Sequence, residues 1–263
     1  MQKETYLQNC LRDGKIRRWS DSSQTLKVYI APFRFYTQAN EDAKYRGLVM
    51  KALDEWQKIS GGKISFEIVT SLMNSQINID WQRVERQALG YCYFSFDKIG
   101  RLFSAEVQIG ISDGIIHQQY MAENEVYHTI LHEIGHALGL GHSPFEDGIM
   151  FTPHKYGVIT ISANDILTFQ WLYRFAPGAD PAQIASQYGI VSPDLDLVVA
   201  ELRKKNHKSE FEKVKNSIKT VKKDLLKEQQ NIADLKKYNI ALQNISISED
   251  TRKFFIDQQR KNK

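Results

Sequence analysis

The chain has 263 residues, of which 42% are hydrophobic and 11% aromatic, so it is long enough for one sizeable core with an appended element. Its formal charge of +4 is uneven, because residues 194–263 carry a net +6 and residues 1–193 a net −2. No stretch approaches the roughly 20 apolar residues of a membrane-spanning helix, and two cysteines exclude a disulfide-rich scaffold.

Alternating, β-prone runs predict strands, and apolar residues at helical spacing predict helices. Strands are expected at 25–31, 63–69, 76–81, 88–96 and 102–111. Helices are expected at 41–60, within 123–142 and at 161–175, where Ser162 and Asp165 form a capping-box-like start. The order strand, helix, several strands, helix, loop, helix predicts one α+β domain.

The C-terminal third of the chain differs in kind. Residues 177–193 are rich in proline and glycine and predict a linker with a short helix at 181–187. Beyond it, apolar residues recur at heptad-like spacing among lysines and glutamates, which predicts a long α-helical tail or a helical hairpin. Such a tail could pack as a solvated helix, self-associate as a coiled coil or bind a partner. Nucleic acid is a less favoured partner, because acidic residues interrupt the lysines and aromatic residues are sparse.

Residues 132–142, HEIGHALGLGH, carry the chemistry of the chain. His132 and His136 are four residues apart on a helix, so both rings leave the same face and can bind one metal ion. Glu133 can then accept a proton from a water on the open side of that ion. Gly139 tolerates a positive φ, so it can end the helix and bring His142 back as a third ligand. Three histidines and one open position are typical of catalytic zinc.

HEIGHALGLGHS resembles the zinc motif of metzincins, in the form found in matrixins, the matrix metalloproteinase family. The family follows the third histidine with serine, here Ser143, and has a methionine eight residues after that histidine, here Met150. Segment 161–173 resembles the last helix of the family, and segment 90–109 resembles its paired strands. The resemblance covers roughly residues 17–175. It implies a metzincin-like fold, with a twisted, mostly parallel sheet, an active-site helix and a C-terminal helix, and with Met150 as an apolar floor under the ligands.

The resemblance also implies the activity. A zinc-activated water, with Glu133 as general base, would hydrolyse internal peptide bonds of protein or peptide substrates. Residues 88–94 would be the edge strand along which an extended substrate lies. The substrate-binding residues expected on this basis come from that strand and from the wall after the methionine: Tyr91, Cys92, Tyr93, Pro153 and Tyr156.

Some features depart from the family pattern. Many matrixins hold a second, structural zinc and several calcium ions in a long loop before the edge strand, but that loop is short here, and Tyr91 stands where the family often has a zinc-binding histidine. One Zn²⁺ is therefore expected, and calcium stays open as a further ion, without support from the sequence. Near the N-terminus, the Cys10 thiolate or Asp13 could in principle cap the zinc, although a surface or packing residue is the favoured interpretation. The remaining histidines are not assigned to metal: His117, His128, His154 and His207.

A competing hypothesis is a zinc-containing binding module without activity, whose helical tail mediates protein interaction. Glu133 argues against it, because a structural zinc site needs no general base and usually has a fourth ligand. The resemblance implies an extracellular protein, but the first residues show no signal peptide, so a cytoplasmic location also stays open. The expected domains are an N-terminal segment, a zinc metalloprotease domain, a linker and an amphipathic or coiled-coil tail, at 1–16, 17–176, 177–193 and 194–263.

Overall fold

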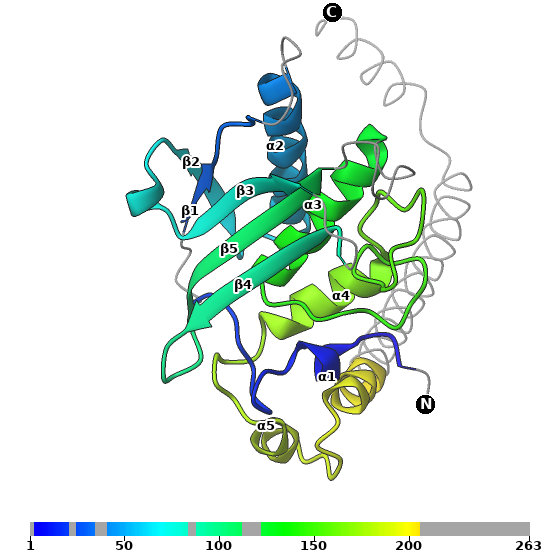
Figure 1. Cartoon of the computed structure of the whole chain (residues 1–263). Coiled ribbons are helices and arrows are strands. Elements are labelled where there is room, and N and C mark those ends of the chain that lie inside the picture. Colours follow the sequence, from blue (N-terminus) through cyan, green and yellow to red (C-terminus); the bar gives the residue numbers. More distant parts are fainter. Residues whose placement is uncertain (1–2, 21–24, 35–40, 84–87, 112–121, 206–263) are drawn as a thin grey trace, which may run out of the picture. The chain divides into compact units, whose positions relative to one another are not determined.

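The computed structural model describes residues 3–20, 25–34, 41–83, 88–111 and 122–205 (Figure 1). The chain divides into two compact units, Met1–Arg203 and Lys204–Lys263. The fold described below is that of the first unit. The second unit lies outside the described residues apart from its first two, and with it most of the tail expected at 194–263.

Five strands form one sheet in the order β2-β1-β3-β5-β4. Strands β1 (Thr25–Ile30), β2 (Ser65–Val69), β3 (Ile77–Arg83) and β5 (Leu102–Ile111) are mutually parallel, and β4 (Gly90–Phe96) runs antiparallel to β5 at one edge. The mostly parallel sheet predicted from the sequence is therefore confirmed, and each predicted strand lies within a few residues of its expected position (Figure 1).

The pairing register lines up apolar side chains on one face of the sheet. Ile79 is paired with Ile30 on one side and with Val107 on the other, and Val107 is paired with Cys92 on the edge strand. Partners in neighbouring strands point to the same face, so these four residues form one row. Ile30, Ile79 and Val107 are buried. The alternation along the edge strand places Tyr91 and Tyr93 on the opposite face.

Helices α2 (Glu41–Ile59) and α3 (Glu123–Ala137) pack on each other, and α3 also contacts β5 and β4 (Figure 1). The fully buried Trp56 of α2 donates its Nε1–H to the carbonyl oxygen of Leu131 on α3, with N and O 3.0 Å apart. This bond fixes the helix that carries the histidine motif against the rest of the core.

Helix α4 (Ala163–Leu172) begins at a complete capping box formed by Ser162 and Asp165. The Ser162 hydroxyl accepts from the backbone N–H of Asp165, and the Asp165 carboxylate accepts from the backbone N–H of Ser162. Asp165 is fully buried. The capping residue of this helix, expected from the sequence, therefore also lies inside the core.

The two ends of the first unit pack together. Residues 5–10 include the short helix α1 (Leu7–Cys10), and their apolar members Tyr6, Leu7 and Cys10 are buried. Asp196 lies in the first turn of the helical residues 195–205, and its carboxylate accepts from the Thr5 hydroxyl and the Leu7 backbone N–H. The segments set apart from the sequence as 1–16 and 177–193, the latter containing helix α5 (Pro181–Gln187), thus belong to the same compact unit as the sheet.

Among the helices in the described part of the chain, none is long and apolar enough to cross a membrane.

Candidate active site

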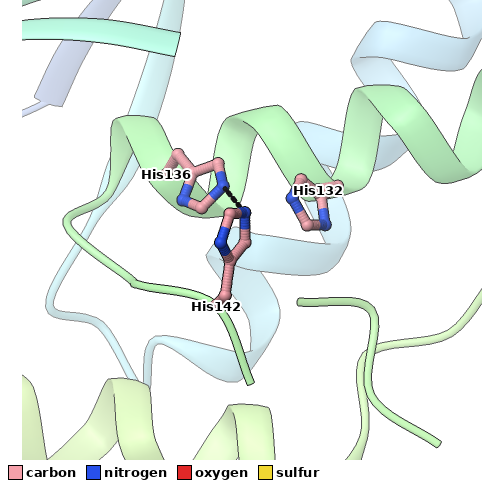
Figure 2. Close-up of side chains that lie close together, drawn as sticks. All are labelled: His132, His136 and His142. Atoms are coloured by element: carbon pink, nitrogen blue, oxygen red, sulfur yellow. Dashed lines mark hydrogen bonds between the residues drawn. The ribbon is translucent and has the colours of Figure 1, made fainter. Parts of the chain in front are cut away.

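The three histidines of the motif converge on one point (Figure 2). His132 and His136 lie one turn apart on α3, and His142 reaches them from the loop that follows the helix. One ligand nitrogen of each lies within 4.8 Å of the others, and the Nε2 atoms of His136 and His142 are 3.2 Å apart. Two nitrogens at about 2.0–2.1 Å from a tetrahedral zinc ion would be roughly 3.3 Å apart. The donor set and the spacing therefore fit zinc.

Backbone carbonyls orient two of these rings. His132 Nδ1 is 2.8 Å from the Ile149 carbonyl oxygen, and His136 Nδ1 is 2.8 Å from the Leu140 carbonyl oxygen. A carbonyl only accepts, so each Nδ1 carries the proton and leaves Nε2 with a lone pair for a metal. Burial lowers the pKa of His132 well below its ordinary value and that of His136 to about 4. Both rings are thus held in the neutral form that metal binding requires.

The turn after α3 brings in the third histidine. The backbone N–H of Gly139 donates to the His136 carbonyl, and that of Leu140 donates to the Gly135 carbonyl, which ends the helix. Gly139 has φ of 98°, a conformation that glycine adopts without the strain of a side chain. A Cβ on Gly139 would also lie 2.7 Å from the carbonyl oxygen of Arg17.

Glu133 lies under the edge strand. It is only 6% exposed, and burial raises the pKa of its carboxyl to about 8. A Cβ added to Gly90 of β4 would lie 2.8 Å from Glu133 Cγ and 2.9 Å from Glu133 Oε1. The absence of a side chain at Gly90 therefore lets the edge strand pass directly over the carboxylate. A dication on the histidines would favour the charged form of Glu133.

A buried methionine forms the floor of the site. Met150 is fully buried, and its side chain fills the space that a Cβ on Gly135 of the motif would occupy. The backbone N–H of Ser143, directly after the third histidine, donates to the Met150 carbonyl at 2.7 Å. The turn at Met150 and the loop carrying His142 are thus fixed to each other.

The buried carboxylate of Asp165 holds the floor from below. It accepts from the backbone N–H of Ile149 at 2.8 Å and from the Tyr6 hydroxyl at 2.7 Å, besides Ser162. Ile149 in turn provides the carbonyl that orients His132. A chain of hydrogen bonds therefore runs from the N-terminal segment to a metal-facing ring.

The N-terminal segment also contacts the loop of the third histidine. Asn9 donates through Nδ2 to the His142 carbonyl at 2.8 Å, and the Gly141 backbone N–H donates to the Cys10 sulfur at 3.3 Å. A Cβ on Gly141 would overlap the Asn9 carbonyl oxygen. Burial raises the pKa of Cys10 to about 12, so it is held as a thiol. This packing position is at odds with a thiolate cap on zinc, and Asp13 instead pairs with Arg17.

A cavity of about 500 Å³ opens beside the histidines. One side is lined by residues 88–92 at the start of β4, the other by residues 151–154, and its base by α3. His128 and Thr129, one turn before the motif, belong to that base. The cavity therefore joins the three histidines and Glu133 to the edge of the sheet.

The matrixin family model matches residues 18–174, which is more than half of the chain. The chain belongs to the matrixin family. A viral protein described as "Probable matrix metalloproteinase 095L", from Invertebrate iridescent virus 3, is 44% identical over 62 residues. That match covers 22% of this chain and 16% of the viral protein, so the chain spans less than a fifth of that relative. Membership of this zinc-dependent family supports the assignment of the chain as a metalloprotease. The cluster of three histidines in this matrixin could bind the metal.

The expected substrate-binding residues divide into two groups. Tyr91, Cys92 and Pro153 line the cavity. Tyr93 is 59% exposed and Tyr156 is 65% exposed, and neither lines the cavity. Tyr93 lies on the same face of β4 as Tyr91 and stacks on its ring, but only Tyr91 lines the cavity. The structure thus brings the first group to the matrixin site and leaves the other two residues outside the cavity wall.

Several residues at this site were not singled out from the sequence. Gly90 was not singled out, because a glycine at the start of a predicted strand is typical of a turn. Asn9 hydrogen-bonds to His142, which lies 133 positions later in the sequence, and no local sequence pattern indicates such a bond. His128 lies one turn before His132, a spacing that places both rings on one face of the helix and lets it approach the site, but packing or hydrogen bonding was the favoured prediction. His117 and His207 lie outside the described residues.

Proposed function

We propose that this matrixin domain is a zinc-dependent endopeptidase, with His132, His136 and His142 as metal ligands and Glu133 as general base. The observation that carries the proposal is the convergence of three histidine nitrogens beside a buried carboxylate, in a cavity under a sheet edge. Zinc bound there would act as a Lewis acid and supply an activated water near neutral pH.

The side chains of the protein then account for the proton transfers. Glu133 accepts a proton from the attacking water, holds it in the water-poor space under Gly90, and returns it to the leaving amine nitrogen. Burial favours the protonated form of Glu133, and a zinc ion on the histidines would favour the charged form, so the carboxylate can both accept a proton and release it again. No covalent bond between protein and substrate is needed.

The substrate would lie along β4. This strand is the last in the sheet order, so its outer edge has no partner strand among the described residues. An extended peptide can pair with such an edge through backbone hydrogen bonds, which tolerate many sequences. Its scissile bond would then cross above Glu133, and the next side chain would enter the cavity.

The decisive experiment compares the full chain with Glu133→Gln on a mixed peptide library, with and without a chelator. We expect zinc content to be retained by the variant and cleavage to fall about 100- to 10,000-fold, the usual contribution of a general base. Chelation should stop cleavage by the parent. Glu146→Gln is the matched control, because that carboxylate is 73% exposed and forms a surface pair with Lys155.

Cleavage that survives chelation or the Glu133 variant would contradict the proposal. A parent that holds zinc and cuts no peptide would instead favour the binding-module hypothesis, in which protein interaction through the tail is the function. Against that hypothesis, the described residues offer only three clustered metal ligands, whereas structural zinc sites usually have four.

A further inference from the structure

The cavity beside the metal ligands has an unusual polar base. His128 lies one turn before His132 on α3, and the two rings are 14° from parallel with centroids 6.1 Å apart. Each ring bonds through Nδ1 to a backbone carbonyl of the segment after the motif, His132 to Ile149 and His128 to Val158. His128 therefore repeats the arrangement of His132, and because it lines the cavity with Nδ1 engaged by Val158, Nε2 is the ring nitrogen left for a ligand.

That nitrogen is a hydrogen-bond acceptor. The Val158 carbonyl lies 2.5 Å from His128 Nδ1 and can only accept, so Nδ1 carries the proton. In the neutral ring, Nε2 then has a lone pair and no hydrogen. Burial, followed by the neighbouring His154, lowers the pKa of His128 to about 4, in keeping with a neutral ring.

Thr129, next to His128 in this base, also accepts rather than donates. The Thr129 hydroxyl gives its one hydrogen to the Glu125 carbonyl at 3.1 Å, so only its lone pairs can serve the cavity. The His154 ring lies 3.8 Å from the His128 ring, and its Nε2 is 2.5 Å from the carboxylate of Glu125, which is 2% exposed. The Glu125 carboxyl thus lies behind the wall, and no lysine or arginine is among the described residues that line the cavity.

We propose that this cavity selects substrates whose side chain after the cleaved bond carries an N–H or O–H donor, such as glutamine, with His128 as the specificity-determining acceptor. The proposal rests on the peptidase function above, because only a peptide crossing the metal along β4 would place that side chain here. A plain aliphatic side chain would leave His128 Nε2 and Thr129 Oγ1 without a partner once water is displaced. A carboxylate would face acceptors only.

The test uses three zinc-chelating hydroxamates that differ only in the side chain next to the chelating group, which is that of glutamine, methionine or glutamate. The hydroxamate fixes the register on the metal, and the three side chains are similar in length. Dissociation constants are measured by calorimetry on the zinc-loaded full chain. We expect the glutamine compound to bind roughly 2- to 10-fold more tightly than the methionine compound, as for one net hydrogen bond, and the glutamate compound to bind most weakly.

Two variants assign the effect to His128. His128→Leu removes the acceptor and should reverse the order of glutamine and methionine. His128→Gln is its matched control, because a side-chain amide, like a neutral imidazole, donates at one end and accepts at the other, so the glutamine preference should persist. A parent that binds the methionine or glutamate compound most tightly, or an order that His128→Leu leaves unchanged, would overturn the proposal.

Peptide cleavage assays on the same samples separate this proposal from the peptidase function. Tightest binding of the glutamine compound without cleavage of any peptide would sustain the cavity assignment and overturn the peptidase. Cleavage together with tightest binding of the methionine compound would sustain the peptidase function and overturn the cavity assignment. A chain that takes up no zinc would overturn both.

Discussion

Gly90 sets how closely the edge strand passes over Glu133. Because a Cβ there would lie within 2.9 Å of atoms of both Glu133 and Thr129, Gly90→Ala should push the carboxylate or the strand out of place. We expect kcat to fall by up to about 100-fold, the cost of misplacing a catalytic group by about 1 Å. Zinc content should not change, since no ligand moves. The measurement is kcat and KM on one cleaved peptide, with metal analysis.

A matched glycine supplies the control for Gly90→Ala. Gly47 lies in α2 with no atom within 4 Å of an added Cβ, so Gly47→Ala should leave kcat unchanged and raise helix stability by up to about 1 kcal/mol. Unaltered kcat in Gly90→Ala would mean that the strand and Glu133 accommodate the methyl group, and the close approach would then have no catalytic role.

At the scale of single residues, the sequence predicted the cluster of three histidines but not its supports. The three histidines and Glu133 follow from spacing on one helix and one glycine turn, which are local rules. Asp165 was expected only as a helix cap, although its carboxylate also anchors Ile149 and Tyr6. Those bonds join segments distant in sequence, and they depend on the packed fold rather than on a repeating pattern.

At the scale of elements, the N-terminal segment acts as a brace for the loop of the third histidine. Asn9→Ala removes the only side-chain bond that the structure gives to the His142 carbonyl within the described residues. The loss of one hydrogen bond, about 1 kcal/mol, should loosen this ligand and speed zinc dissociation roughly 2- to 10-fold. Release into a colorimetric chelator measures this rate.

Its neighbour gives the control for Asn9→Ala. Gln8 donates to the exposed Pro193 carbonyl and, in the described part of the chain, makes no bond to the loop that carries His142, so Gln8→Ala should leave the rate of zinc release unchanged. Equal rates for Asn9→Ala and the parent would show that the turn at Gly139 alone holds His142 in place.

The elements themselves were largely predictable. Strands and the three long helices carry period-2 or helical patterns, and the structure places them within a few residues of expectation. Helix α1 was not predicted, because four residues are too few for a periodicity. The N-terminal segment was therefore set apart, although its buried side chains make it part of the core.

At the scale of the whole molecule, buried histidines make the zinc-free fold sensitive to acid. The pKa of His128 falls from about 6.5 to about 4 on burial, so between these values the unfolded chain binds a proton that the folded chain does not. The free energy of unfolding therefore decreases as pH falls through this range. His132 and His136 act in the same direction, whereas Glu133, with a raised pKa, opposes them below about pH 8.

Comparison of the parent with His128→Gln isolates the contribution of His128 to this pH dependence of the free energy of unfolding. After chelation, the loss of stability between pH 7 and pH 5 should be smaller in the variant by about 2 kcal/mol, from the two pKa values of His128. Urea unfolding at both pH values measures it. Equal losses in both proteins would show that His128 titrates in the fold as it does in the unfolded chain.

The boundary of the compact unit gives the last prediction. A chain ending at Arg203 keeps Asp196, whose buried carboxylate accepts from Thr5 and Leu7, so it should retain the zinc content, activity and melting temperature of the matrixin domain. A chain ending at Ser192 loses those bonds and the buried Leu195, Val198 and Val199. Loss of this apolar burial costs about 1.5–3 kcal/mol per side chain. Summed over the three side chains, this loss should lower the melting temperature by about 10 °C or more.

The same two truncations separate a structural role of residues 194–203 from any role of the positively charged residues beyond them. Sedimentation of the full chain and of the chain ending at Arg203 tests self-association through the predicted helical tail. A larger full-length species beside a monomeric, active truncation would place association in residues 204–263. If the chain ending at Ser192 melted like the longer one, the bonds of Asp196 would be dispensable, and the domain boundary would move back toward the linker expected from the sequence.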